Sequence, residues 1–231
     1  MSKLPKINLP KYELKLFTMI NPVTYRVFTV GEQKQLLLAK ESDKLEDKIQ
    51  AIKNTVKTCT FGTVDVDNLA FFDLETLFLR IRSKSVSNQS QITFKVKDSK
   101  TKIKVDINLD DVGLKVDESH SKTVWITDTI GMNFKYPSIA MMYKAETEQT
   151  NMVFECLESI FDGDVLTSKA DITKEEFDEF IDGFDPEHLS KVKKFFDTIP
   201  RLEHEIEIKY LMDEKEVVEK IKLVGLNDFF G

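Results

Sequence analysis

The sequence predicts an α+β fold, with a mostly antiparallel sheet built from hairpins and an α-helical module in its second half. Two observations carry this prediction. Several segments repeat apolar residues at steps of three and four, which is the spacing of one face of a helix. Others alternate apolar and polar residues and are joined by short turns. Such turns favour antiparallel pairing, because parallel strands need long crossover connections.

The first part of the chain is expected to form a hairpin followed by three helices. Residues 12–16 and 25–28 alternate on either side of Asn21-Pro22, which is a turn signal. Helical spacing then predicts helices over residues 32–40, 43–58 and 70–82. Near the start of the third helix, Asp73 and Glu75 suit the positive end of the helix dipole.

Beyond the third helix, the pattern changes from helical spacing to alternation. Residues 92–96 and 103–107 alternate and predict a second hairpin. A further strand is expected at residues 123–127, and residues 130–136 either continue it or form a separate strand. These elements complete an N-terminal region over residues 1–136.

The second half is predicted to be mostly helical. Thr173, with Glu176 three residues later, has the capping-box pattern that opens a helix. Helices are expected over residues 151–161, 174–183 and 185–198. Alternation then returns at residues 203–210 and 217–224 and predicts a closing hairpin. The chain thus divides into residues 1–136, a helical module at 137–202, and a hairpin with an aromatic tail at 203–231, or forms one domain overall.

The charge balance argues against a general phosphate-binding surface. The 231 residues include 33 Lys and Arg against 40 Asp and Glu, a formal net charge of -7, whereas nucleic-acid surfaces need dense positive charge. Lysines do gather in the hairpin at residues 95–104, so a nucleic-acid-binding accessory protein is kept as the alternative function. Phe94 faces inward by alternation, which favours a solvated lysine face over a surface that stacks bases.

No motif indicates a catalytic, metal or cofactor site. Glycine patterns of phosphate-binding loops and nucleophile elbows are absent, and eight glycines leave little material for them. Asp162-Gly163-Asp164 resembles the start of a calcium loop. However, Leu166 and Thr167 stand where that loop needs an oxygen ligand and a glycine. We therefore expect a protein that is not an enzyme and holds no cofactor.

The cysteines and histidines fit the same expectation. Cys59 and Cys156 form no Cys-x-x-Cys pair, so two reduced, buried thiols are favoured, although a disulfide between them stays open. His120, His188 and His204 each lack a second His or Cys within four residues, and we expect each to be solvated or locally hydrogen-bonded. No apolar run approaches the ~20 residues that span a bilayer, and we expect a soluble, intracellular chain.

Both ends of the chain carry apolar residues that need a place to dock. The N-terminal arm places Leu4 and Ile7 among prolines, which cannot continue a helix. The C-terminus holds Leu226, Phe229 and Phe230, and chain ends fray unless they are docked. We expect these side chains to fill a pocket, either within this chain or on a partner, and both alternatives stay open.

Five short segments occur in a fixed order along the chain. The first consists of Leu4-Pro5-Lys6-Ile7 and the alternating strand after it, followed in the sequence by residues 25–34 and 36–39. The other four are residues 77–86, Lys135-Tyr136-Pro137, residues 195–204 and residues 225–230. Together they resemble the baseplate hub subunits and hub-assembly proteins of T4-type contractile-tailed phages. The resemblance departs at Val27, which replaces a proline, and at Ser87, where the family normally has glycine.

This resemblance implies a non-enzymatic protein that helps to build the central hub of the phage baseplate. It implies docking to other baseplate hub proteins in the host cell cytoplasm. It leaves open whether the chain stays in the virion or departs as an assembly chaperone. Some members carry cysteine pairs near the final hairpin, and because this chain has none there, no metal role is carried over. The residues expected to contact partners are Leu4, Ile7, Arg80, Arg82, Lys84, Leu226, Phe229 and Phe230.

Overall fold

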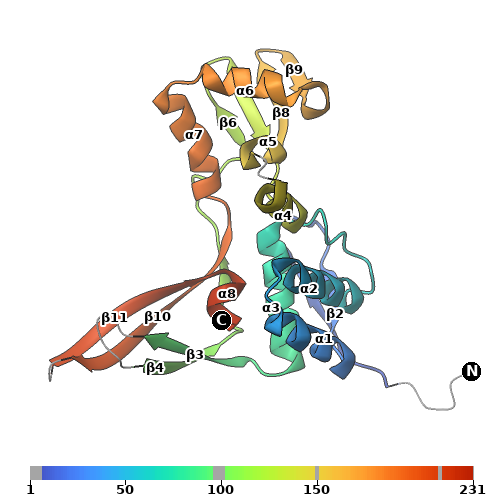
Figure 1. The fold of residues 1–231 in the computed structure, drawn as a ribbon, viewed down its shortest axis with the longest axis vertical. Coiled ribbons are helices and arrows are strands. Elements are labelled where there is room, and N and C mark those ends of the chain that lie inside the picture. The colour runs from blue at the N-terminus through green and yellow to red at the C-terminus, as the bar shows by residue number, and fades with distance from the viewer. Residues whose placement is uncertain (1–6, 96–101, 149–150, 213–214, 231) are drawn as a thin grey trace, which may run out of the picture. The chain divides into compact units, whose positions relative to one another are not determined.

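The computed structural model describes residues 7–95, 102–148, 151–212 and 215–230 (Figure 1). It confirms an α+β protein whose strands pair antiparallel in small sheets. The chain forms two compact units. Unit 1 combines Met1–Leu114 with Arg201–Gly231, and unit 2 is the intervening segment Lys115–Pro200. Each unit buries an apolar cluster of its own.

Unit 1 begins with the predicted hairpin and three helices. The hairpin pairs β1 (Lys11–Leu14) with β2 (Val23–Arg26). The helices are α1 (Val30–Glu41), α2 (Leu45–Cys59) and α3 (Phe71–Ser85). Helix α3 has buried residues on several faces, including Leu74, Leu77 and Leu79. A helix that is apolar on several faces is buried by packing on more than one side, and α3 is therefore the central element of unit 1.

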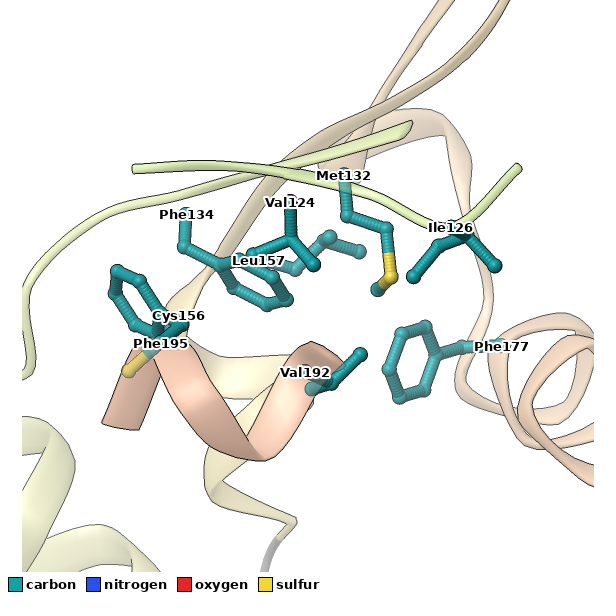
Figure 2. Packing of buried hydrophobic residues seen from close by; sticks show 9 residues of the cluster. All are labelled: Val124, Ile126, Met132, Phe134, Cys156, Leu157, Phe177, Val192 and Phe195. Carbon is teal, nitrogen blue, oxygen red and sulfur yellow. The ribbon is translucent and has the colours of Figure 1, made fainter. Parts of the chain in front are cut away.

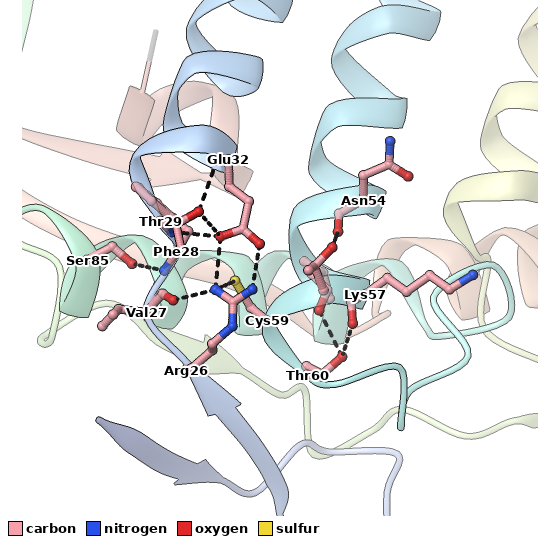
Figure 3. A network of polar contacts seen from close by, with 12 residues as sticks. Arg26, Val27, Phe28, Thr29, Glu32, Asn54, Lys57, Cys59, Thr60 and Ser85 are labelled. Atoms are coloured by element: carbon pink, nitrogen blue, oxygen red, sulfur yellow. Dashed lines mark hydrogen bonds and ion pairs between the residues drawn. The ribbon is translucent and has the colours of Figure 1, made fainter. Parts of the chain in front are cut away.

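A polar network fixes the junction between β2 and α1 (Figure 3). The Arg26 guanidinium donates to both carboxylate oxygens of Glu32, at 2.9 and 2.7 Å. Glu32 also completes a capping box with Thr29, whose backbone N–H donates to it at 2.6 Å. Burial alone would raise the pKa of Glu32, but the hydrogen bonds from Arg26 and Thr29 outweigh it and hold that pKa below its usual value. Phe28 N–H donates to Ser85 Oγ, which ties this junction to α3.

The rest of unit 1 consists of hairpins and a short C-terminal helix. Its elements are β3 (Gln89–Lys95), β4 (Lys102–Asn108), β5 (Gly113–Lys115), β10 (Arg201–Met212), β11 (Lys215–Val224) and α8 (Gly225–Phe230). Strands β3 and β4 pair with each other, and the second sheet has the order β11-β10-β5. The chain thus leaves unit 1 near residue 114 and returns at residue 201 to complete its sheet.

Unit 2 is a four-stranded antiparallel sheet with helices. The strands are β6 (Thr123–Trp125), β7 (Ile130–Phe134), β8 (Leu157–Asp162) and β9 (Val165–Ser168), in that spatial order. The helices are α4 (Ile139–Glu148), α5 (Met152–Cys156), α6 (Lys174–Asp182) and α7 (Pro186–Asp197), with a 3₁₀ turn at Lys169–Asp171. Figure 2 shows Val124 and Met132 of the sheet pointing toward Val192 of α7 and Phe177 of α6. The core of unit 2 therefore lies between one face of the sheet and these two helices.

One predicted helix is wrong over half its length. Residues 151–161 were expected to be helical, but only Met152–Cys156 is helix and Leu157–Asp162 is strand β8. Its apolar residues come partly as adjacent pairs, such as Ile160-Phe161, and that pattern fits strand as well as helix. Pairing with β7 on one side and β9 on the other decides the outcome, because β propensity depends on such tertiary contacts.

The two units do not coincide with the predicted boundary at residue 136. Strands β6 and β7 lie within unit 2, where β7 pairs with β8. This sheet could not be assigned to the second half of the chain while β8 was read as helix. The predicted division at residues 136 and 202 into folding domains stays a prediction.

Candidate partner-binding surfaces

Arg80 of helix α3 is engaged within unit 1. Its guanidinium donates to the backbone oxygens of Leu109 and Val112, at 2.6 Å each, and lies 4.0 Å from Asp110. Its side chain is only 19% exposed. Arg80 thus holds the loop after β4 in place, and its five donors suit this task because they lie in a rigid fork.

Arg82 and Lys84 lie further along the same helix. Arg82 donates to Ser87 O at 3.1 Å, and burial lowers the pKa of its guanidinium. Lys84 pairs with Asp110 at 3.2 Å with a side chain that is 36% exposed. Of the three basic residues expected to contact partners, Lys84 is the one that is exposed at the surface. Their role in binding stays a prediction.

The C-terminal helix α8 is attached to α3 through the buried carboxylate of Glu75, which the sequence pattern related only to the dipole of a helix. Leu226 N–H donates to Glu75 Oε1 at 3.0 Å, and Leu226 packs against the core cluster around Leu79 and Leu223. Burial raises the pKa of Glu75 to about 7. Gly225 has a φ of +69°, and a Cβ there would lie 3.0 Å from the same Glu75 oxygen. Glycine thus lets the chain turn and approach the carboxylate closely.

The other apolar residues predicted at the chain ends differ in what the structure describes. Ile7 is 87% exposed, so it is available for contact with a partner. Leu4 and the side chains of Phe229 and Phe230 lie outside the described residues, although the backbone of both phenylalanines belongs to α8. Among the described side chains of these terminal apolar residues, Leu226 is the one that packs within the chain, through its contacts with Glu75 and the core cluster.

The lysine-rich hairpin has the register that its alternation predicts. Thr93 lies opposite Lys104, and Lys95 opposite Lys102. Phe94 is partly buried and packs against the core cluster of unit 1, as expected from alternation. Residues 96–101, which include Lys97 and Lys100, lie outside the described residues.

The two cysteines are buried, and one histidine is partly buried. Cys59 and Cys156 are free thiols, and burial raises their pKa to about 12 and about 11. Both are therefore protonated at neutral pH and poor nucleophiles. His120 was expected to be solvated or bonded to a near neighbour in sequence. Instead it stacks on Tyr136, its Nδ1 lies 2.9 Å from Thr198 Oγ1, and burial lowers its pKa.

Metal-ligand clusters and membrane-spanning helices are both absent from the described ranges. Across these ranges, no three His, Cys, Asp or Glu side chains are grouped so that they could hold a metal ion. Among the helices of those same ranges, none is long and apolar enough to cross a membrane.

Comparison with known proteins assigns the chain to a family. A family model described as T4 bacteriophage base plate protein matches residues 9–231. The chain belongs to this family. No curated protein and no solved structure matches it. The match includes residues of both units. A member of this family is a component of the phage tail that interacts with other baseplate proteins.

Proposed function

We propose that the chain is a component of the central hub of the phage baseplate, or an assembly chaperone of that hub, and acts by protein–protein docking without catalysis. The observation that carries the proposal is the base plate family match over residues 9–231. The resemblance of five segments to hub subunits and hub-assembly proteins supports the hub over other parts of the baseplate. The chain would meet its hub partners in the host cell cytoplasm during assembly.

The proposed docking elements are the two chain ends and the basic end of α3. Ile7 is exposed, as docking of the N-terminal arm requires. Lys84 lies at the surface end of α3. In α8, residues 229 and 230 come three and four positions after Leu226, whose backbone N–H is hydrogen-bonded to Glu75. Buried aromatic and arginine side chains provide much of the binding energy at protein interfaces.

The experiment replaces the terminal aromatic pair and retains its anchor. Phe229→Ser with Phe230→Ser leaves in place Leu226 and also Asp228, whose carboxylate accepts from Val224 N–H at 2.7 Å. We expect a folded protein that no longer enters the baseplate hub during infection. Val218→Ser is the matched control, because Val218 is an exposed apolar residue of β11 in the same unit. Normal baseplates built with the double variant would contradict the role of the tail.

A second measurement, on virions, distinguishes a resident subunit from a chaperone. Purified virions made with the unaltered chain contain it if it is a hub subunit and lack it if it is a departing chaperone. The alternative function, a nucleic-acid-binding accessory protein that uses the hairpin at residues 95–104, predicts affinity for DNA that falls steeply with salt. A flat salt response removes that alternative.

A further inference from the structure

The face of the unit 2 sheet that points away from its helices carries an apolar row. Trp125 pairs with Gly131, Gly131 with Phe161, and Phe161 with Leu166, across all four strands. Residues directly opposite each other in a sheet share a face, and successive residues of a strand point to opposite faces. Since Val124 and Met132 point into the core in Figure 2, Trp125 and Gly131 point outward, and the row follows them.

The row is built as a unit and centred on the glycine. A Cβ at Gly131 would lie 2.2 Å from Cζ of Phe161, so the ring of Phe161 lies directly across the glycine. The same ring meets Trp125 edge to face, with centroids 4.9 Å apart. Both aromatic side chains are thus held in one arrangement by the sheet, and such pre-ordering lowers the entropy lost on binding.

The row is open to contact along its length. Trp125 is 54% exposed and Leu166 is 65% exposed, while Phe161 between them is half-buried. Leu166 belongs to β9, the last strand of the sheet, whose sequence Val-Leu-Thr-Ser holds none of the lysines or prolines that usually protect an edge. An apolar, unprotected edge beside the exposed Trp125 is typical of a surface that contacts another protein.

The rim of the row is acidic. Asp128 lies in the turn between β6 and β7, and Asp164 lies in the turn between β8 and β9. The two turns adjoin, because Gly163 N–H donates to Thr129 O at 3.0 Å. Both carboxylates are exposed, and in the part of the chain that the structure describes no cation forms an ion pair with either of them.

One lysine approaches the same end of the sheet from the other side. Lys191 of α7 donates to Ile126 O at 2.9 Å and pairs with Glu187. Because Ile126 belongs to the core cluster, this contact lies on the helix-facing side. The outward-facing row therefore combines an apolar centre with a rim of uncompensated negative charge.

We propose that this face of unit 2, with Trp125, Phe161 and Leu166 at its centre, is a docking surface for a partner protein whose apolar contact residues are flanked by Lys or Arg. Charge complementarity selects this occupant, since the aspartates of the rim attract a basic protein surface and repel phosphate groups. Nucleic acids and anionic membranes are disfavoured for the same reason. The surface is additional to the proposed hub-docking elements, all of which belong to unit 1.

A photo-crosslinking amino acid at position 166 tests the proposal. The full chain is made in host cells infected by the phage, irradiated, and its crosslinked peptides are identified by mass spectrometry. The matched control carries the same amino acid at Leu189, an exposed leucine of α7 in the same unit. We expect position 166 to join one other baseplate protein at an apolar segment flanked by Lys or Arg, and position 189 not to do so.

Neutralising the rim tests the charge argument. The double variant Asp128→Asn, Asp164→Asn should lower the crosslinking yield at position 166 about fivefold, because each exposed ion pair contributes about a two- to threefold factor. The control removes two exposed charges from α6, with Asp178→Asn and Asp182→Asn, and should leave the yield unchanged. Circular dichroism and the emission of the single Trp125 confirm that each variant is folded.

Three outcomes would overturn the proposal. They are a folded protein with no crosslink from position 166, a crosslink to a second copy or to an acidic segment, and a yield that the rim variant does not change. None of these bears on the hub assignment, which is tested by the variants of Phe229 and Phe230 in unit 1. The two ideas can therefore fail separately.

Discussion

Replacing Glu75 with glutamine should remove a large part of the pH dependence of the stability of unit 1. The Glu75 carboxyl is buried on α3 and accepts a hydrogen bond from Leu226 N–H. Burial raises its pKa from 4.5 to about 7, although that hydrogen bond opposes the shift. The folded protein therefore holds this proton more tightly than the unfolded chain does.

The sign and size of the effect follow from this difference in pKa. Between pH 4.5 and pH 7 the folded state binds more protons at this site, so the stability that the group contributes falls as the pH rises. One pKa unit corresponds to about 1.4 kcal/mol, so ionised Glu75 costs about 3 kcal/mol above pH 7 relative to its neutral form. Glutamine keeps an acceptor for Leu226 N–H and does not ionise.

The assay compares urea unfolding of the parent and Glu75→Gln at pH 5 and pH 8, followed by circular dichroism. We expect similar free energies of unfolding at pH 5 and a variant that is more stable by about 2–3 kcal/mol at pH 8. Hydrogen exchange at Leu226 reports on α8 itself, and its protection should fall with pH only in the parent. An equal pH dependence in both proteins would refute the reasoning.

Two further predictions concern the partly buried polar side chains of Arg80 and His120. Arg80→Met should destabilise unit 1 by about 2 kcal/mol, because Leu109 O and Val112 O lose charged donors, whereas Arg201→Met, at a side chain that is 49% exposed, should change urea unfolding little. In unit 2, burial lowers the pKa of His120, so the folded state resists protonation and stability should fall as the pH drops below 6.5. Thermal unfolding followed by Trp125 emission at pH 7.5 and pH 5.5 measures this loss, and an equal loss in His120→Gln would contradict it.

The fold was predictable where local signals agree with the tertiary environment. Helix α6 begins at the capping box of Thr173 and α7 begins at Asp185-Pro186, and both signals can be read from the sequence. Strand β8 could not be predicted in this way, because its apolar pairs suit either structure and its two neighbours decide. The Asp162-Gly163-Asp164 segment forms the turn between β8 and β9, with φ of +56° at Gly163, and the sequence pattern did not predict this turn.

The candidate sites were less predictable than the fold because they depend on long-range contacts. From the sequence, Asp73 and Glu75 are ordinary partners for the dipole of a helix. In the structure Asp73 is buried and accepts from Phe17 and Thr18 N–H, and Glu75 bonds to Leu226. Nothing local marks residues so distant in sequence as neighbours. The row that includes Trp125 likewise needs the register of four strands before it can be recognised.

Unit 2 is inserted between the two sequence segments of unit 1, and this determines the order in which their residues leave the ribosome. Unit 2 is a continuous segment, so all of its contacts become available once Pro200 has emerged from the exit tunnel. Unit 1 must wait for β10 and β11, because β10 pairs with β5 and its Leu202 lies in the core beside Leu79. At that point the first hairpin, α1, α2 and α3 still lack their closing strands. Until β10 and β11 follow, Leu79 lacks its core neighbours Leu202 and Leu223, and apolar side chains that are exposed in this way are prone to aggregate.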